Sequence, residues 1–173
     1  MSSIYFILVG LCFIGVGIRA VYEHQKELGK VDLENKLLFW AVFMAMGMFL
    51  FTWPFFTGMD PLQISLPGWL RYSGLAILIL GVLLSVGGVL QLRGLENIDH
   101  LVTTGIYSKI RHPMYAGFIL WISGWILFNG ALLSVLAGII CVWNVLHWRH
   151  LEEINLVSSY GDAYLKYAKT TLF

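Results

Sequence analysis

Charged side chains are scarce in this sequence of 173 residues, of which only 12% are Asp, Glu, Lys or Arg while 58% are hydrophobic. Ordinary soluble domains carry about 25% charged residues, so the polar side chains here are too few to cover a surface that faces water. The length suits a single domain. The composition therefore predicts an integral membrane protein, for which the bilayer is the natural solvent of much of the chain.

A strong net charge and metal-binding motifs are also missing. The formal net charge is +1, which leaves no basic footprint for a nucleic acid partner and no acidic tail. Cys12 and Cys141 each lie in an apolar run, and the sequence has no CxxC or Cys/His cluster, so we predict no structural metal. Both cysteines are interpreted as buried small hydrophobic residues.

Hydrophobic runs divide the chain into five segments. A helix that crosses a bilayer needs about 20 residues, with a range of about 17 to 25. The first, second, third and fifth runs meet this length, and the fourth run meets it only if its helix begins near His112. Asn129-Gly130 is typical of a tight turn, so the last two runs are predicted to form a helical hairpin. The runs are Ile4–Val21, Leu37–Thr57, Leu70–Leu90, Met114–Phe128 and Ala131–Trp148.

We therefore predict an all-α bundle of about five transmembrane helices in one domain, residues 1–173, with the first three helices in residues 1–90. The first run is interpreted as a mature helix, because it lacks a preceding basic region and a cleavage site of small residues. Small residues at helical spacing predict close contacts between helices. These stripes are Gly74, Gly81, Ser85 and Gly88 in the third run, Gly117 and Gly124 in the fourth, and Gly10 and Gly17 in the first.

The positive charges indicate how the chain is oriented in the membrane. With five crossings, ten of the eleven Lys and Arg residues lie on one side and Arg71 alone lies on the other. We therefore predict an external N-terminus and a cytoplasmic C-terminus, in a plasma, bacterial inner or endoplasmic reticulum membrane. The ten residues are Arg19, Lys26, Lys30, Lys36, Arg93, Lys109, Arg111, Arg149, Lys166 and Lys169.

Polar residues concentrate in two places that the hairpin would bring together on the cytoplasmic side. One is the long connection from Gln91 to His112, and the other follows the fifth run. Arg149 and Glu153 are four residues apart and share a helix face, which alone is typical of an interfacial salt bridge. His112-Pro113 alone is typical of a helix start, because proline is favoured in a first helical turn.

Four motifs in this region stand in a specific order. Leu-Val-Thr-Thr-Gly-Ile-Tyr occupies 101–107, Arg-His-Pro-Met-Tyr-Ala-Gly occupies 111–117, Glu-Glu occupies 152–153, and Gly-Asp-Ala-Tyr-Leu-Lys-Tyr occupies 161–167. The ordered set resembles the family of isoprenylcysteine carboxyl methyltransferases and the related phospholipid and thiol methyltransferases. The resemblance covers roughly residues 90–170, about half of the chain. It is lost at Thr171-Leu172-Phe173, where family members usually continue with a basic, proline-containing stretch.

The resemblance implies a membrane methyltransferase that uses S-adenosylmethionine, releases S-adenosylhomocysteine and acts on a lipophilic or prenylated acceptor beside membrane lipids. Residues 91–173 would form its catalytic core, with a cytoplasmic cofactor pocket between the loop before the fourth helix and the C-terminal segment. Arg149 is implied to bind the acceptor and, with Glu153, to be catalytic. The implied cofactor-binding residues are Gln91, His100, Leu101, Val102, Tyr107, His112, Pro113, Tyr115 and Glu153.

These residue types suit the chemistry. Methyl transfer from a sulfonium is mainly a matter of positioning two partners, and a carboxylate acceptor needs no general base. Arg149 could hold such a carboxylate by paired hydrogen bonds. Tyr107 and Tyr115 could stack on adenine or face the sulfonium cation. Glu153 could bond the ribose or amino group of the cofactor, or keep Arg149 oriented.

Other functions fit the same sequence less well. Phospholipid N-methylation and thiol S-methylation are close alternatives to carboxyl O-methylation, the best-known activity of the family. Membrane sterol reductases have a similar C-terminal core and bind NADPH, but they are usually much longer chains. A non-enzymatic scaffold or transporter subunit is a third alternative, and a transporter should show polar groups near the bilayer midplane, where Asn144 is the main candidate.

Overall fold

The computed structural model describes residues 2–32, 35–92 and 100–173, and within them the chain is helical, with two isolated β-bridges and no strand. The predicted all-α fold is confirmed, and each of the five hydrophobic runs corresponds to one α-helix. The elements are α1 (Ser2–Glu27), α2 (Lys36–Gly58), α3 (Gly68–Leu92), the 3-10 turn η1 (Gly105–Ser108), α4 (Pro113–Asn129) and α5 (Ser134–Ala168).

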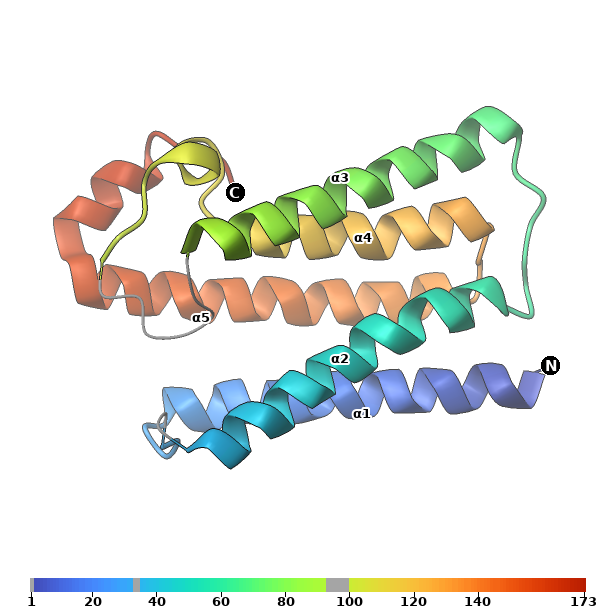
Figure 1. The fold of residues 1–173 in the computed structure, drawn as a ribbon, viewed down its shortest axis with the longest axis horizontal. Helices are drawn as coiled ribbons and strands as arrows, with labels where there is room; N and C mark the ends of the chain where they lie inside the picture. Colours follow the sequence, from blue (N-terminus) through green and yellow to red (C-terminus); the bar gives the residue numbers. More distant parts are fainter. Residues whose placement is uncertain (1, 33–34, 93–99) are drawn as a thin grey trace.

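The helices run back and forth along the long axis of the molecule (Figure 1). α3 packs along α4, α1 packs along α2, and α5 contacts both α4 and α1. The N-terminus, the α2–α3 connection and the α4–α5 turn lie at one end. The α1–α2 connection, the C-terminal end of α3, η1 and the C-terminus lie at the other, which we call the polar end.

The predicted hairpin of α4 and α5 is confirmed. Gly130 ends α4 in a left-handed conformation with φ of 61°, where its N–H caps carbonyls of the last turn. The start of α5 is fixed by Asp60 in the α2–α3 connection, whose carboxylate accepts 2.6 Å hydrogen bonds from the N–H and the hydroxyl of Ser134. Asp60 is only 5% exposed, so this buried contact holds the end of the bundle opposite the polar end.

Close contacts between helices occur at small residues, as predicted for α3 and α4. A Cβ atom on Gly81 would lie 2.7 Å from the Gly117 carbonyl oxygen, so the two backbones can approach only because both residues are glycine. For α1, the prediction that Gly10 and Gly17 make a close helix contact was wrong. A Cβ on Gly10 or Gly17 would meet nothing within 4 Å, whereas Gly15 faces the backbone of Ala45 on α2. Spacing identifies a helix face but not the face that meets a neighbour.

The outer faces of the helices are apolar. Leu37, Trp69 and Trp143 are 81%, 74% and 73% exposed, as expected for side chains that face lipid rather than water. In the described residues α1, α2 and α3 are each long and apolar enough to cross a membrane, while α4 is apolar but has 17 residues. The five-crossing topology therefore stays a prediction. Arg93, one of the ten basic residues on which its orientation rests, lies outside the described residues.

Aromatic and small side chains form the interior where α1, α2, α4 and α5 meet. Trp53 and Phe56 on α2 are fully buried and pack edge to face at 4.9 Å. Cys12 and Cys141 are also buried, with exposures of 0% and 1%. Their interpretation as buried small residues is therefore confirmed.

Candidate ligand-binding site

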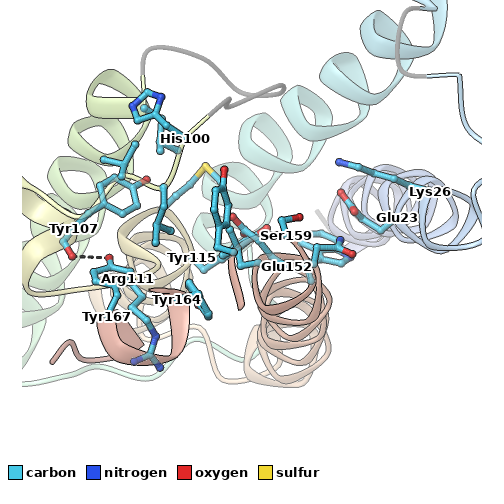
Figure 2. Close-up of a pocket in the computed structure, with 18 of the residues that line it drawn as sticks. Glu23, Lys26, His100, Tyr107, Arg111, Tyr115, Glu152, Ser159, Tyr164 and Tyr167 are labelled. Carbon is cyan, nitrogen blue, oxygen red and sulfur yellow. Dashed lines mark hydrogen bonds between the residues drawn. The ribbon is translucent and has the colours of Figure 1, made fainter. Parts of the chain in front are cut away.

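A polar cavity of about 360 Å³ lies at the polar end of the bundle. This volume falls in the range of about 300–1,000 Å³ that is typical of small-molecule sites. Its wall is built from the segment His100 to Val102, η1, the start of α4, the C-terminal half of α5 and the end of α1. In Figure 2, Tyr107 and Tyr167 lie on one side of this polar cavity, and Glu23 and Lys26 of α1 lie on the opposite side.

The loop wall of the polar cavity is held in place by hydrogen bonds to its backbone. Gln91 at the end of α3 donates from its amide to the Thr104 carbonyl and accepts from the Ile106 N–H at 3.0 Å. Tyr107 is 7% exposed, and its carbonyl accepts a 2.6 Å hydrogen bond from the Tyr167 hydroxyl. The loop before α4 is thus tied both to α3 and to the C-terminal part of α5.

The start of α4 carries the Arg-His-Pro motif into the same region. Pro113 occupies the first turn of α4, where its missing N–H costs no hydrogen bond, and packs against Gly88 of α3. Tyr115, two residues further along α4, is 8% exposed and lines the polar cavity. His112 is 4% exposed and lies behind the wall.

Glu153 on α5 lies among three basic side chains, and we call these four residues the Glu153 cluster. One carboxylate oxygen, Oε1, lies 2.9 Å from His112 Nε2, 3.2 Å from Arg111 Nε and 3.5 Å from Arg149 Nη2. Burial alone would raise the pKa of Glu153, but the hydrogen bond from His112 and the charges of His112 and Arg111 outweigh it, so the pKa is lowered. The carboxylate is therefore held in its charged form.

Arg111 also connects the Glu153 cluster to the end of the chain. Its Nη1 donates to the carbonyls of Ala168 and Thr171, the latter at 3.1 Å. The backbone adds two bonds, from Leu172 N–H to the Lys109 carbonyl at 2.8 Å and from Arg111 N–H to the Leu172 carbonyl at 3.0 Å. Because of these bonds, the chain after α5 packs against the loop that precedes α4.

Arg149 lies outside the wall of the polar cavity. Its guanidinium carbon is 4.5 Å from the centre of the Phe173 ring, and Nη2 faces Glu153. Its Nε is buried and has no hydrogen-bond partner among the described residues. An unpaired buried donor on a charged group is costly, which makes this atom a candidate for a contact with a ligand.

A kink at Gly161 directs the last turns of α5 into the site. Gly161 has φ of 51° and ψ of −127°, a conformation that residues with a Cβ rarely adopt. The segment beyond it turns back toward η1 (Figure 1) and brings Tyr164 and Tyr167 into the wall of the polar cavity. Burial, followed by the nearby charge of Glu153, raises the pKa of the Tyr164 hydroxyl, so this group stays neutral.

The structure divides the ten predicted site residues into two groups, and their roles stay predictions. His100, Leu101, Val102, Tyr107 and Tyr115 line the polar cavity. The others lie outside its wall: Gln91 holds the loop, Pro113 packs on α3, and His112, Arg149 and Glu153 belong to the Glu153 cluster.

Sequence reasoning missed two groups of lining residues. Arg19, Glu23 and Lys26 of α1 line the polar cavity, and their spacing of four and three residues places them on one helix face. Glu152 and Ser159 of α5 also line it, two turns apart on one face. The spacing was visible in the sequence, but only the structure shows that α1 packs beside α5 and lines the polar cavity opposite the loop before α4.

The apolar helices and the polar cavity at one end are those of a multi-helix membrane protein with a candidate ligand site at the end of its bundle. The family described as phospholipid methyltransferase matches residues 69–163, more than half of the chain. The chain therefore belongs to the phospholipid methyltransferase family, and the resemblance inferred from the motifs is confirmed.

Curated relatives match about two fifths to three fifths of the chain. It is 42% identical over 76 residues to a protein-S-isoprenylcysteine O-methyltransferase of Schizosaccharomyces pombe, in a match covering 43% of this chain and 32% of the relative. It is 31% identical over 111 residues to protein-S-isoprenylcysteine O-methyltransferase B of Arabidopsis thaliana (58% and 56%). The human protein-S-isoprenylcysteine O-methyltransferase is 29% identical over 116 residues (58% and 39%). The chain thus spans between a third and somewhat over half of these relatives, and no solved structure matches it significantly.

Proposed function

We propose that this chain is an S-adenosylmethionine-dependent methyltransferase and that its acceptor is the carboxylate of an isoprenylcysteine-type substrate. The observation that carries the proposal is the polar cavity, because motif residues from the loop, α4 and the end of α5 meet in its wall. The family match and the names of the relatives favour methyl transfer over the NADPH-dependent and non-enzymatic alternatives. In this proposal residues 91–173 form the catalytic core, and the helices of residues 1–90 complete a single domain.

The side chains of the polar cavity fit this cofactor. The Glu152 carboxylate can accept hydrogen bonds from ribose hydroxyls or from an ammonium group. The rings of Tyr107 and Tyr115 can stack on adenine or face a sulfonium cation, and the backbone near Leu101 can bond polar atoms. Bound S-adenosylmethionine supplies an activated methyl group, whose transfer to a carboxylate releases S-adenosylhomocysteine and a neutral ester.

The protein has little to do beyond holding two partners in place, because no proton moves when a carboxylate is methylated. The Glu153 cluster joins the start of α4 to α5 and so fixes two walls of the polar cavity relative to each other. Such orientation can lower a reaction barrier by about 7 to 11 kcal/mol. The proposed role of Arg149 is to hold the acceptor carboxylate through its guanidinium, for which its unpaired buried Nε leaves a free donor.

The polar end faces the cytoplasm in this proposal, and the N-terminus lies outside. Nine of the ten residues that set this orientation lie in the described part, on segments that end at or connect at the polar end. A cytoplasmic position would give the polar cavity access to a soluble cofactor and to a membrane-bound acceptor. Protease should cleave a C-terminal tag only from the cytoplasmic side of sealed vesicles, and cleavage only from the other side would reverse the orientation.

The proposed reaction is tested by transfer of a labelled methyl group to four acceptors: N-acetyl-S-farnesylcysteine, its carboxamide, phosphatidylethanolamine and a long-chain thiol. We expect the free carboxylic acid alone to be methylated. Methylation of the amine or the thiol instead would replace carboxyl O-methylation by one of the two alternatives. Arg149→Ala should weaken use of the acid, and normal affinity with normal turnover in this variant would refute the role of Arg149.

A further inference from the structure

A second cavity, of about 380 Å³, lies beside the polar cavity, and its wall is mostly apolar. Residues of α2, α3 and α4 provide most of this wall, among them Val42, Met46, Val89 and Phe118. We call it the apolar cavity. The polar cofactor does not require an apolar space of this size, whereas the hydrocarbon chain of a lipophilic acceptor does.

The two cavities meet at four residues that line both: Arg19, Met114, Tyr115 and Trp148. Of these four, Arg19 alone carries a charge. A cation is thus placed where an otherwise apolar space opens into a polar one. This arrangement complements a molecule that has a long hydrocarbon chain and one anionic group at its end.

The guanidinium of Arg19 is held in position by its neighbours. It forms an ion pair with Glu23 through Nη2, and its central carbon lies 5.4 Å from the ring centre of Tyr22 and 5.9 Å from that of Trp148. The Arg19 side chain is 22% exposed. A guanidinium can hold two carboxylates through separate edges of its donor fork, so Glu23 can orient Arg19 without occupying it fully.

We propose that Arg19 is an acceptor-binding residue, which holds the anionic group of the acceptor at the junction while the hydrocarbon chain lies in the apolar cavity. This inference rests on the proposed function for the identity of the anionic group, a carboxylate. Methylation would turn that carboxylate into a neutral ester and remove its attraction to Arg19. The same residue would therefore favour binding of the acceptor and release of the product.

The direct test measures equilibrium binding rather than turnover, in detergent, for N-acetyl-S-farnesylcysteine, its carboxamide and its methyl ester. Since a hydrogen bond to a charged group contributes about 1.5–3 kcal/mol, the wild type should bind the acid at least about tenfold more tightly than either neutral ligand. Arg19→Gln should reduce this preference, and Arg19→Lys should keep more of it. Lys30→Gln is the matched control, because Lys30 is exposed and lines neither cavity.

A second variant should change affinity in the opposite direction. Glu23→Gln removes the carboxylate that competes for Arg19, and an ion pair of this exposure contributes up to about 1 kcal/mol, so the acid should bind about two- to fivefold more tightly. A loss of folding cannot produce tighter binding. Unchanged or weaker binding of the acid by Glu23→Gln would contradict the proposed competition.

Binding of the hydrocarbon chain in the apolar cavity is tested by a separate variant. Val89→Phe adds volume within the apolar cavity and should weaken binding of the farnesyl acid more than that of a short-chain analogue. An acid preference that is undiminished in Arg19→Gln, or a wild type that binds acid and amide equally, would overturn the inference. Displacement of all three ligands by phospholipid, with equal affinity for acid and amide, would indicate a cavity for bilayer lipid instead. An intact acid preference without methyl transfer would uphold Arg19 and refute the proposed reaction.

Discussion

Two adjacent glutamates at the polar end have different surroundings. Glu153 faces Arg111, His112 and Arg149 and has a side chain that is 23% exposed. Glu152 lines the polar cavity, and its side chain is 42% exposed. Because consecutive residues of a helix point in different directions, one carboxylate stabilises the fold and the other is available to a ligand. The two residues can therefore be tested as a matched pair.

The Glu153→Gln variant should be less stable at neutral pH. The substitution keeps the size of the side chain but removes charge-assisted hydrogen bonds, which contribute about 1.5–3 kcal/mol each, so the loss should be on the order of 1–3 kcal/mol. Because the folded-state pKa of Glu153 is lowered, its contribution is complete above the ordinary value of 4.5 and is lost as the pH falls through the lowered value. Unfolding in detergent should thus separate wild type from variant at pH 7 and bring them together in acid. A difference that persists in acid would exclude ionised Glu153 as the cause.

The Glu152→Gln variant should show the opposite pattern. Its melting temperature should match that of the wild type, because Glu152 is more exposed and its ion pair with His112 Nδ1 is long, at 3.6 Å. Its affinity for S-adenosylhomocysteine should fall about tenfold, as expected when one charge-assisted hydrogen bond is lost. Calorimetric titration beside the melting curves checks both. Unchanged affinity would remove Glu152 from the proposed cofactor site.

The elements of the polar end are arranged by two features of the backbone, the hairpin turn at Gly130 and the kink at Gly161. The kink matters more for the site, because it changes the direction of α5 after the cluster of charges. The hydrogen bond from Tyr167 to the Tyr107 carbonyl then closes one side of the polar cavity (Figure 2). A straight α5 would carry these tyrosines away from the loop.

Gly161→Ala tests whether the kink forms the site. A Cβ at this position would meet nothing within 4 Å, so the substitution acts only through the backbone conformation. Strain of this kind costs about 1–3 kcal/mol and should favour a straighter α5, with weaker binding of S-adenosylhomocysteine. Gly47→Ala on α2 is the matched control, because it also lacks neighbours within 4 Å but lies inside a regular helix, where alanine is tolerated. Equal ligand affinity in both variants would show that the kink does not build the site.

At the scale of the whole molecule, the local features were predictable from the sequence. The hydrophobic runs located each α-helix of the described residues, because apolar length and composition determine which segments suit a bilayer. Gly130 ended α4 where the Asn-Gly turn predicted it. The resemblance to the family also indicated five residues of the polar cavity wall, Tyr107 and Tyr115 among them.

Contacts between distant segments were not predictable in the same way. The run that predicted the fifth helix ended at Trp148, but α5 continues to Ala168, because its later turns are polar and carry no apolar signal. Arg19 served only to orient the chain, since nothing in its spacing shows that α1 packs beside α5. The contacts of Glu153 with Arg111 and His112 span about forty residues and depend on the hairpin.

Equilibrium binding of S-adenosylhomocysteine to the detergent-purified wild type, with NADPH as competitor, tests the central claim most directly. We predict saturable binding that NADPH does not displace and that Glu152→Gln weakens. A folded sample that fails to bind S-adenosylhomocysteine, or that releases it to NADPH, would contradict the assignment of the polar cavity to a methyl donor.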